Sequence, residues 1–359
     1  MNCESPVSIR EMYFAAMHRQ SEAYVPFEFN LCPALHAEFM RRTGRDDYWE
    51  YYAFATRNIE VSYVGDLDRF ARYFPDKVGF QIDPDWGVGH KKGSLAHFTE
   101  MQHPMENFQK LAEFEAYPYP DATSGYDWNA FAGRVEAIRA RDLVVVAAMQ
   151  MTIFEIAWDL RGMETFLMDL LLNPDLANYH LDRITEIRCE MAKRYAAAGC
   201  DVLSLGDDVS TQLAMMMKVA TWREFLKPRL AKVIQSAKSV RPDMLIFYHG
   251  DGNLQAIIPE LIEIGVEILN PIQPECMDPV IIKKQYGERL SFWGTIGTQT
   301  TMPFGTAVEV RQVCQKMFQE VGRGGGLGLA PTHVLEPEVP WANIQAFVDA
   351  VNEYNHQAV

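Results

Sequence analysis

A histidine and an aspartate stand two positions apart in FYHGDGN, residues 247–253, at the end of the apolar run MLIF. Imidazole nitrogens and carboxylate oxygens together hold divalent metals of the zinc type. Later in the chain, Glu275 follows ILNPIQP and His333 ends GLGLAPTH. The candidate metal ligands are therefore His249, Asp251, Glu275 and His333. Because 84 residues separate His249 from His333, only the fold can bring them together.

Other polar residues follow apolar runs in the same way. Asp207 and Asp208 come after VLSLG, and we assign them, with Glu275, to catalysis as proton carriers or substrate clamps. Each has an ordinary alternative: loop carboxylates are usually solvated, and Asp251 or Asn253 could cap the following helix. The candidate substrate-binding residues are Glu28, Asn30, Met149, Gln150, Phe154, Gln273 and Gln299. For the apolar stretch from Met149 to Phe154, helix or barrel packing is an equal alternative.

The elements that would position these residues alternate along the chain. Near-continuous apolar runs predict strands within 23–30, 78–83, 142–149, 200–208, 243–252, 266–272, 290–297 and 326–333. Helical periodicity predicts helices over 221–238, 253–265, 278–287 and 305–322. Buried strands separated by helices indicate a parallel sheet, and about eight such units close a (β/α)8 TIM barrel. The carboxyl ends of its strands would then meet at one mouth.

The expected fold class is thus α/β, a TIM barrel with an N-terminal helical extension. The chain reads as one domain over 1–359, with about 1–65 forming the helical layer and first unit and about 66–355 the remainder of the barrel. The aromatic stretch 46–58 belongs to this region of short helices, which forms the helical layer and the first barrel units. A doubly wound open sheet is the alternative, but no GxGxxG follows an early strand, so its dinucleotide-binding form has little support.

The composition of the chain excludes some classes of binding partner. The chain has 33 basic and 48 acidic residues and a formal net charge of −15, which repels nucleic acid and anionic lipid. No apolar run reaches the ~20 residues of a membrane span, and the first residues lack the order of a signal peptide, so we expect a cytoplasmic protein. Six cysteines without CxxC spacing predict reduced thiols.

Two segments carry a resemblance to a known family. Residues 249–305, from HGDGNLQAIIPELIEIG to TTMPFG, and residues 329–354, LAPTHVLEPEVPWANIQAFVDAVNEY, resemble the uroporphyrinogen decarboxylase superfamily. Within it, the chain is similar to the branch of corrinoid-dependent methyltransferases and O-demethylases. The resemblance is strong over 200–355 and implies a (β/α)8 barrel.

The resemblance also implies a metal site with altered ligands. Zinc-dependent methyltransferases of this branch carry a His-x-Cys pair, a later Glu and a second Cys near the end. Here His249 takes the histidine place, Asp251 the first cysteine place, Glu275 the glutamate place and His333 the last cysteine place. With both thiolates replaced, the site is harder and better suited to activating an oxygen than a thiol.

The function implied is metal-dependent transfer of a methyl group from a small methylated substrate, of the methoxy-aromatic type, to a corrinoid on a partner protein. Zinc or another divalent metal would be the cofactor. Decarboxylation of a carboxylated tetrapyrrole is the alternative; decarboxylases of the family carry an arginine-containing RQAGRY-type stretch. In the equivalent region, 27–47, Arg41, Arg42 and Arg45 come late, and Glu28 would repel a polyanion. A non-catalytic corrinoid-binding barrel is the second alternative.

Overall fold

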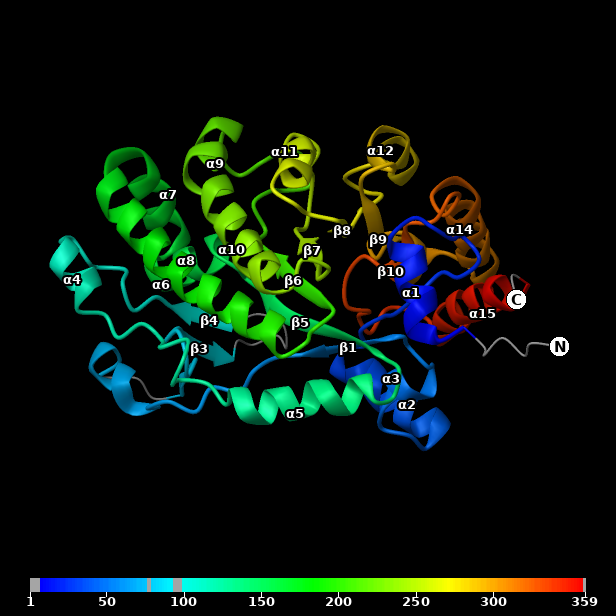
Figure 1. The fold of residues 1–359 in the computed structure, drawn as a ribbon, viewed down its shortest axis with the longest axis horizontal. Helices are drawn as coiled ribbons and strands as arrows, with labels where there is room; N and C mark the ends of the chain where they lie inside the picture. The colour runs from blue at the N-terminus through cyan, green and yellow to red at the C-terminus, as the bar shows by residue number, and fades with distance from the viewer. Residues whose placement is uncertain (1–6, 76–78, 93–98, 358–359) are drawn as a thin grey trace.

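Seven parallel strands form the central sheet of the protein. The computed structural model describes residues 7–75, 79–92 and 99–357. The strands lie in the order β1 (Thr56–Ile59), β5 (Val144–Gln150), β6 (Val202–Gly206), β7 (Leu245–His249), β8 (Ile268–Asn270), β9 (Ser291–Ile296) and β10 (Leu327–Pro331). All the neighbouring pairs are parallel, and helices cover the outside of the curved sheet (Figure 1). The expected α/β barrel-type fold is confirmed.

The segment between α1 (Ile9–Met17) and α2 (Pro33–Thr43) takes the eighth strand position. Phe27 bridges Leu329 and Leu31 bridges Leu335, both in the parallel sense. These contacts place residues 26–31 beside β10, as the apolar run within 23–30 predicts. On the β1 side, the Thr56 hydroxyl donates a hydrogen bond to the Glu28 carboxylate at 2.8 Å. The carboxyl end of every strand therefore faces the same mouth.

The helices around the sheet follow the amphipathic stretches of the sequence. They include α5 (Trp128–Arg139), α6 (Phe154–Arg161), α7 (Met163–Leu172), α8 (Pro174–Ala197), α9 (Val219–Phe225), α10 (Lys227–Val240), α11 (Ile258–Glu263), α12 (Pro279–Tyr286), α13 (Thr301–Phe304), α14 (Ala307–Glu320) and α15 (Trp341–Gln357). Asp278 caps α12, and Thr306 forms a capping box at the start of α14. None of the helices within the described residues combines the length and apolar character that crossing a bilayer requires.

Two local expectations, the strand within 78–83 and the helix over 221–238, differ from the structure. Residues 79–83 do not supply a barrel strand, because β2 (Gln81–Ile82) pairs antiparallel with β3 (Gly89–Lys92), which pairs with β4 (Thr99–Gln102) in a separate small sheet; Val78 lies outside the described residues. The aromatic stretch 46–58 holds the short helix α3 (Tyr48–Tyr51) and then enters β1, as short helices leading into the first barrel unit predict. The helix expected over 221–238 is divided at Leu226, ahead of Pro228.

Helix α1 (Ile9–Met17) closes the amino-terminal end of the barrel. Its Tyr13, Ala16 and Met17 pack against the inward residues of the strands, among them Val144 and Val202. The backbone also holds it, since the Gly326 amide donates to the Ala16 carbonyl at 2.8 Å. The lumen therefore has a floor built by α1.

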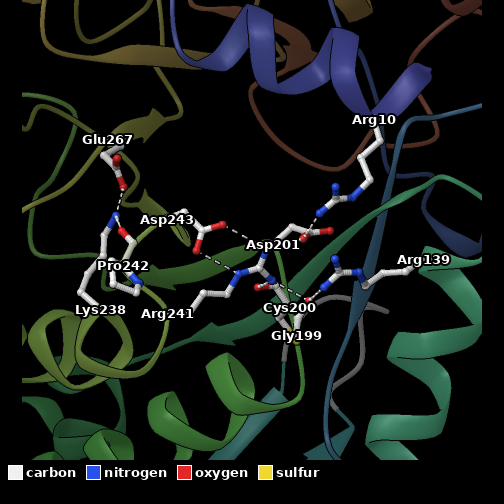
Figure 2. A network of polar contacts seen from close by, with 10 residues as sticks. All are labelled: Arg10, Arg139, Gly199, Cys200, Asp201, Lys238, Arg241, Pro242, Asp243 and Glu267. Carbon is white, nitrogen blue, oxygen red and sulfur yellow. Dashed lines mark hydrogen bonds and ion pairs between the residues drawn. The ribbon is translucent and has the colours of Figure 1, made fainter. Parts of the chain in front are cut away.

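A polar network fixes this floor to the strands (Figure 2). The fully buried Asp201 forms ion pairs with Arg10 of α1 and with Arg241, which follows α10. Its other oxygen accepts a hydrogen bond from the Val145 amide at 3.0 Å. Arg241 and Arg139 also donate to the Gly199 carbonyl. Because Asp201 is both buried and doubly paired, it anchors α1 at the end of the barrel opposite the mouth.

Gly206, the last residue of β6, allows β7 to approach closely. It stands opposite His249 in the strand register. A Cβ at position 206 would lie 2.5 Å from the His249 carbonyl oxygen and 2.7 Å from the His249 Cβ. The end of β7 therefore takes its place only because residue 206 has no side chain.

We expect Gly206→Ala to lower the free energy of unfolding by about 2 kcal/mol, because the new methyl group must displace β7. Thermal and urea unfolding measure the effect. The matched control is Gly133→Ala in α5, where a Cβ meets nothing within 4 Å and helix propensity should raise the stability by about 0.5–1 kcal/mol. Equal stability of the wild type and Gly206→Ala would contradict the close approach.

Candidate metal centre and substrate cavity

A polar cavity occupies the barrel lumen. Alternate strand residues face inward, so Val202 and Ser204 of β6 and Phe247 and His249 of β7 line it. The residues between them, such as Leu203, belong to the core outside the sheet. The cavity has a volume of about 270 Å³ and extends from Tyr13 on α1 to His333 after β10. Among the described residues that line it, none is a lysine or arginine.

Three side chains converge at the mouth of this lumen. Asp208, His249 and Asp251 each offer a ligand atom, and these atoms lie within 4.8 Å of one another. His249 Nε2 is 3.8 Å from Asp208 Oδ1 and 4.0 Å from Asp251 Oδ1. Atoms that share a zinc-type ion at ~2.1 Å lie no more than ~4 Å apart. The spacing of these three residues, here called the rim cluster, is thus close to that of a metal site.

The imidazole of His249 is oriented by a neighbour on β8. His249 Nδ1 lies 2.6 Å from Asn270 Oδ1, and Asn270 Nδ2 donates to the Trp293 carbonyl at 3.1 Å. The second bond assigns the amide orientation of Asn270, so Nδ1 carries the proton and donates it. The Nε2 lone pair is then free and faces the two carboxylates. A histidine fixed through its other nitrogen is the usual arrangement of a metal ligand.

The carboxylate of Asp251 lacks a hydrogen-bond partner of its own. Its Oδ1 is buried and accepts no hydrogen bond from the described residues, whereas its amide donates to Asp208 Oδ1 at 2.7 Å. Burial raises the pKa of Asp251, and His249 and His333 act in the opposite direction. An unsatisfied buried oxygen beside a second carboxylate and a free imidazole nitrogen fits a divalent cation. Asp251 caps no helix in this structure, because α11 begins only at Ile258.

Asp207 lies beside the rim cluster but points into the protein. Its two oxygens accept hydrogen bonds from the Ile153 amide at 3.0 and 3.1 Å, and one also accepts from the Glu155 amide at 3.0 Å. Burial raises the pKa of this carboxyl to about 6. The structure gives Asp207 the role of holding the start of α6, and its assignment to catalysis stays a prediction.

The remaining expected ligands lie near the cluster without joining it. His333 lines the lumen and also an adjoining hollow that contains Asp251, Gln273 and Gln299. Glu275 turns toward the loop after β9, where it accepts a hydrogen bond from the Thr300 hydroxyl at 2.9 Å. The other Glu275 oxygen is buried without a partner among the described residues. All of these residues follow the carboxyl ends of strands, as expected, but the rim cluster takes Asp208 in place of Glu275 and His333.

The expected substrate-binding residues divide according to the face of the strand. Glu28, Asn30 and Gln150 line the lumen. Met149 and Phe154 are buried in the core between the sheet and the helices. For Met149 the reason is strand alternation, since Gln150 points inward and Met149 must point outward. Phe154 is buried as the first residue of α6. The ordinary packing alternative therefore describes these two residues better than ring binding.

Glu155 is a residue that the sequence reasoning missed. Its carboxylate accepts a hydrogen bond from the Asp208 amide at 3.1 Å. Burial, followed by the charges of Asp207 and Asp208, raises its pKa to about 9. Through this hydrogen bond Glu155 supports the loop that carries Asp208. Its position soon after the end of β5 is the signal that could have identified it.

Comparisons with known proteins agree with this architecture. The family model described as uroporphyrinogen decarboxylase (URO-D) matches residues 97–354. The chain belongs to this family. It is 25% identical over 371 residues to a uroporphyrinogen decarboxylase of Pseudomonas syringae pv. tomato, with 99% of this chain and 95% of that protein covered. A uroporphyrinogen decarboxylase of Pseudomonas syringae pv. syringae is 24% identical with the same coverage.

A solved structure extends the likeness to the whole fold. A methyltransferase from Methanosarcina mazei superposes with a TM-score of 0.69 at 19% sequence identity. The match covers 97% of this chain and 99% of that one. The two proteins therefore share their fold over nearly the full length of both chains.

Proposed function

We propose that this member of the uroporphyrinogen decarboxylase family is a metal-dependent methyltransferase. It would move a methyl group from a small methylated substrate, of the methoxy-aromatic type, to a corrinoid acceptor on a partner protein. The rim cluster carries the proposal, because it offers one free imidazole nitrogen and two carboxylates at the mouth of a lumen suited to a small molecule. The fold shared with the Methanosarcina methyltransferase supports it.

Each residue of the site has a defined task in this proposal. His249, Asp208 and Asp251 would hold the ion, and Asn270 keeps the His249 Nε2 lone pair directed at it. A divalent ion bound there supplies a Lewis acid that takes up the negative charge developing on a phenolate leaving group. Gln150 and Asn30 offer amide groups to a substrate in the lumen. The proton-transfer roles of Asp207 and Glu275 remain part of the proposal. His333, which lines the same hollow as Asp251, remains a further proposed ligand.

Decarboxylation of a carboxylated tetrapyrrole is the second candidate, and the curated relatives favour it. The lumen argues against it. A polycarboxylate needs cationic partners, yet neither lysine nor arginine is found among the described lining residues, and Glu28 adds an acid. A non-catalytic corrinoid-binding barrel is the third candidate. It would give no function to the three candidate metal ligands of the rim cluster.

One set of measurements separates the three candidates. The protein is purified without chelators, its metal content is determined, and methyl transfer to reduced cobalamin is assayed with methoxylated aromatics and methylated amines. We expect about one zinc-type ion per chain and methyl transfer that is lost on dialysis against chelator and restored by metal. Metal-free protein that decarboxylates uroporphyrinogen would support the second candidate. Metal-free protein that binds cobalamin without turnover would support the third.

A further inference from the structure

The inner end of the lumen is walled by aromatic rings. Tyr13 of α1, Phe247 of β7 and Trp293 of β9 all line it. The Tyr13 and Trp293 ring centroids lie 6.0 Å apart, and those of Phe247 and Trp293 lie 6.2 Å apart. The rings thus form a connected wall next to the floor that α1 provides. Such walls present the negative faces or the edges of their π systems to a bound ligand.

A carboxylate without a cationic partner completes this wall. Glu28 accepts hydrogen bonds from the Trp293 indole at 3.0 Å and from the Thr56 hydroxyl at 2.8 Å. Both donors are neutral, and no ion pair of Glu28 occurs among the described residues. Burial raises the pKa of Glu28, and the charge of Glu28 contributes to raising that of Tyr13. The Glu28 carboxyl thus lies in the lumen between β1 and β9, and it lines the same cavity as Tyr13.

We propose that Glu28, Tyr13, Phe247 and Trp293 form a subsite for a cationic ammonium head group. A methylated ammonium is the chemistry that fits, because its positive charge pairs with Glu28 while its methyl groups pack against the rings. The statement that this cation is part of the methyl-bearing substrate rests on the function proposed above. The statement that the lumen binds such a cation rests only on the residues that line the cavity.

Electrostatics and size both support this ligand class. Glu28 is a partly buried carboxylate without a counter-ion, which is unfavourable, so a cation that enters the lumen supplies the missing partner. Cation–π attraction to tryptophan and tyrosine faces adds to that pairing. The other polar side chains along the wall, among them Asn58, Gln150 and Ser204, are uncharged. With a cavity of about 270 Å³, the ligand must also be small.

A matched pair of ligands tests the proposal on the metal-loaded protein. Isothermal titration calorimetry compares choline with 3,3-dimethyl-1-butanol, in which carbon replaces the ammonium nitrogen and the shape is kept. We expect choline to bind at least about tenfold more tightly than the neutral alcohol. Equal affinities, or no choline binding in the wild type, would overturn the subsite without any variant being needed.

Variants then locate the binding. Glu28→Gln should abolish the preference for choline, while Glu338→Gln, an exposed acid in the hollow outside the lumen, should keep it. Equal preference in Glu28→Gln and the wild type would mean that choline is attracted by the general negative charge, which rejects the proposal. Melting temperatures confirm that both variants are folded. Turnover of neutral methoxy-arenes without choline binding would reject the subsite alone, and choline binding without methyl transfer would reject the proposed function alone.

Discussion

Replacing His249 by alanine is expected to lower the affinity for a divalent metal by at least about 100-fold and to abolish methyl transfer. His249 supplies the only imidazole nitrogen of the rim cluster, and losing even a second-layer partner of a ligand costs ~10–100-fold. The barrel should stay folded, because this side chain lies at the mouth and not in the core. Metal content after dialysis, titration with Zn²⁺ and circular dichroism measure the three effects.

Two comparisons make the His249 result specific. Asn270→Ala should weaken metal binding by about 10–100-fold, because His249 keeps its place but loses the partner that orients it. His356→Ala, near the end of α15 and exposed, should leave metal content and activity unchanged. Full metal retention and activity in His249→Ala would remove the basis of the proposed function.

Substitutions of the adjacent residues Asp207 and Asp208 should have different effects, one on the free energy of unfolding and the other on metal affinity. Asp208→Ala is expected to lower metal affinity by at least about 100-fold, because the change removes one candidate ligand and the acceptor for the Asp251 amide. Asp207→Ala should keep the metal affinity within about threefold of the wild type. It should instead lower the free energy of unfolding by about 2–3 kcal/mol, since the buried amides of Ile153 and Glu155 lose their acceptor.

Metal titrations and urea unfolding of both variants at one pH provide the comparison. The two substitutions remove the same chemical group from adjacent positions, so each serves as the control for the other. If Asp207→Ala lost the metal and Asp208→Ala kept it, the roles assigned to the two carboxylates would be reversed. Asp207 would then replace Asp208 in the rim cluster.

The barrel, and the end of the barrel at which the site lies, follow from local patterns in the sequence. The apolar runs that end at Gly206, His249 and Asn270 are short and rich in residues that favour strands. The helices between them are amphipathic, so the periodicity of apolar residues alone identifies both kinds of element. Parallel strands place all their carboxyl ends together, which is why His249, Asp251 and His333 were expected near one another. Glu28 was expected at the first strand, and the structure places it in the lumen.

The choice of the third cluster member depends on details that a pattern does not contain. Asp207 and Asp208 are identical in type, and only the hydrogen bonds from the start of α6 turn Asp207 inward and leave Asp208 facing His249. Glu275 accepts a hydrogen bond from the Thr300 hydroxyl and so turns away from the rim cluster. This contact joins two loops, and no local sequence pattern predicts it. Met149 and Gln150 show a second limit, because an apolar run fixes a strand without stating which of its faces is the lumen.

Helix α1 closes the barrel at the end opposite the mouth, so in the proposed reaction the small substrate and the protein-borne acceptor would share one entrance. The substrate would bind before the acceptor protein covers that entrance, and its demethylated product would leave after the acceptor protein dissociates. The proposed function therefore implies an ordered reaction in which the acceptor binds second and leaves first.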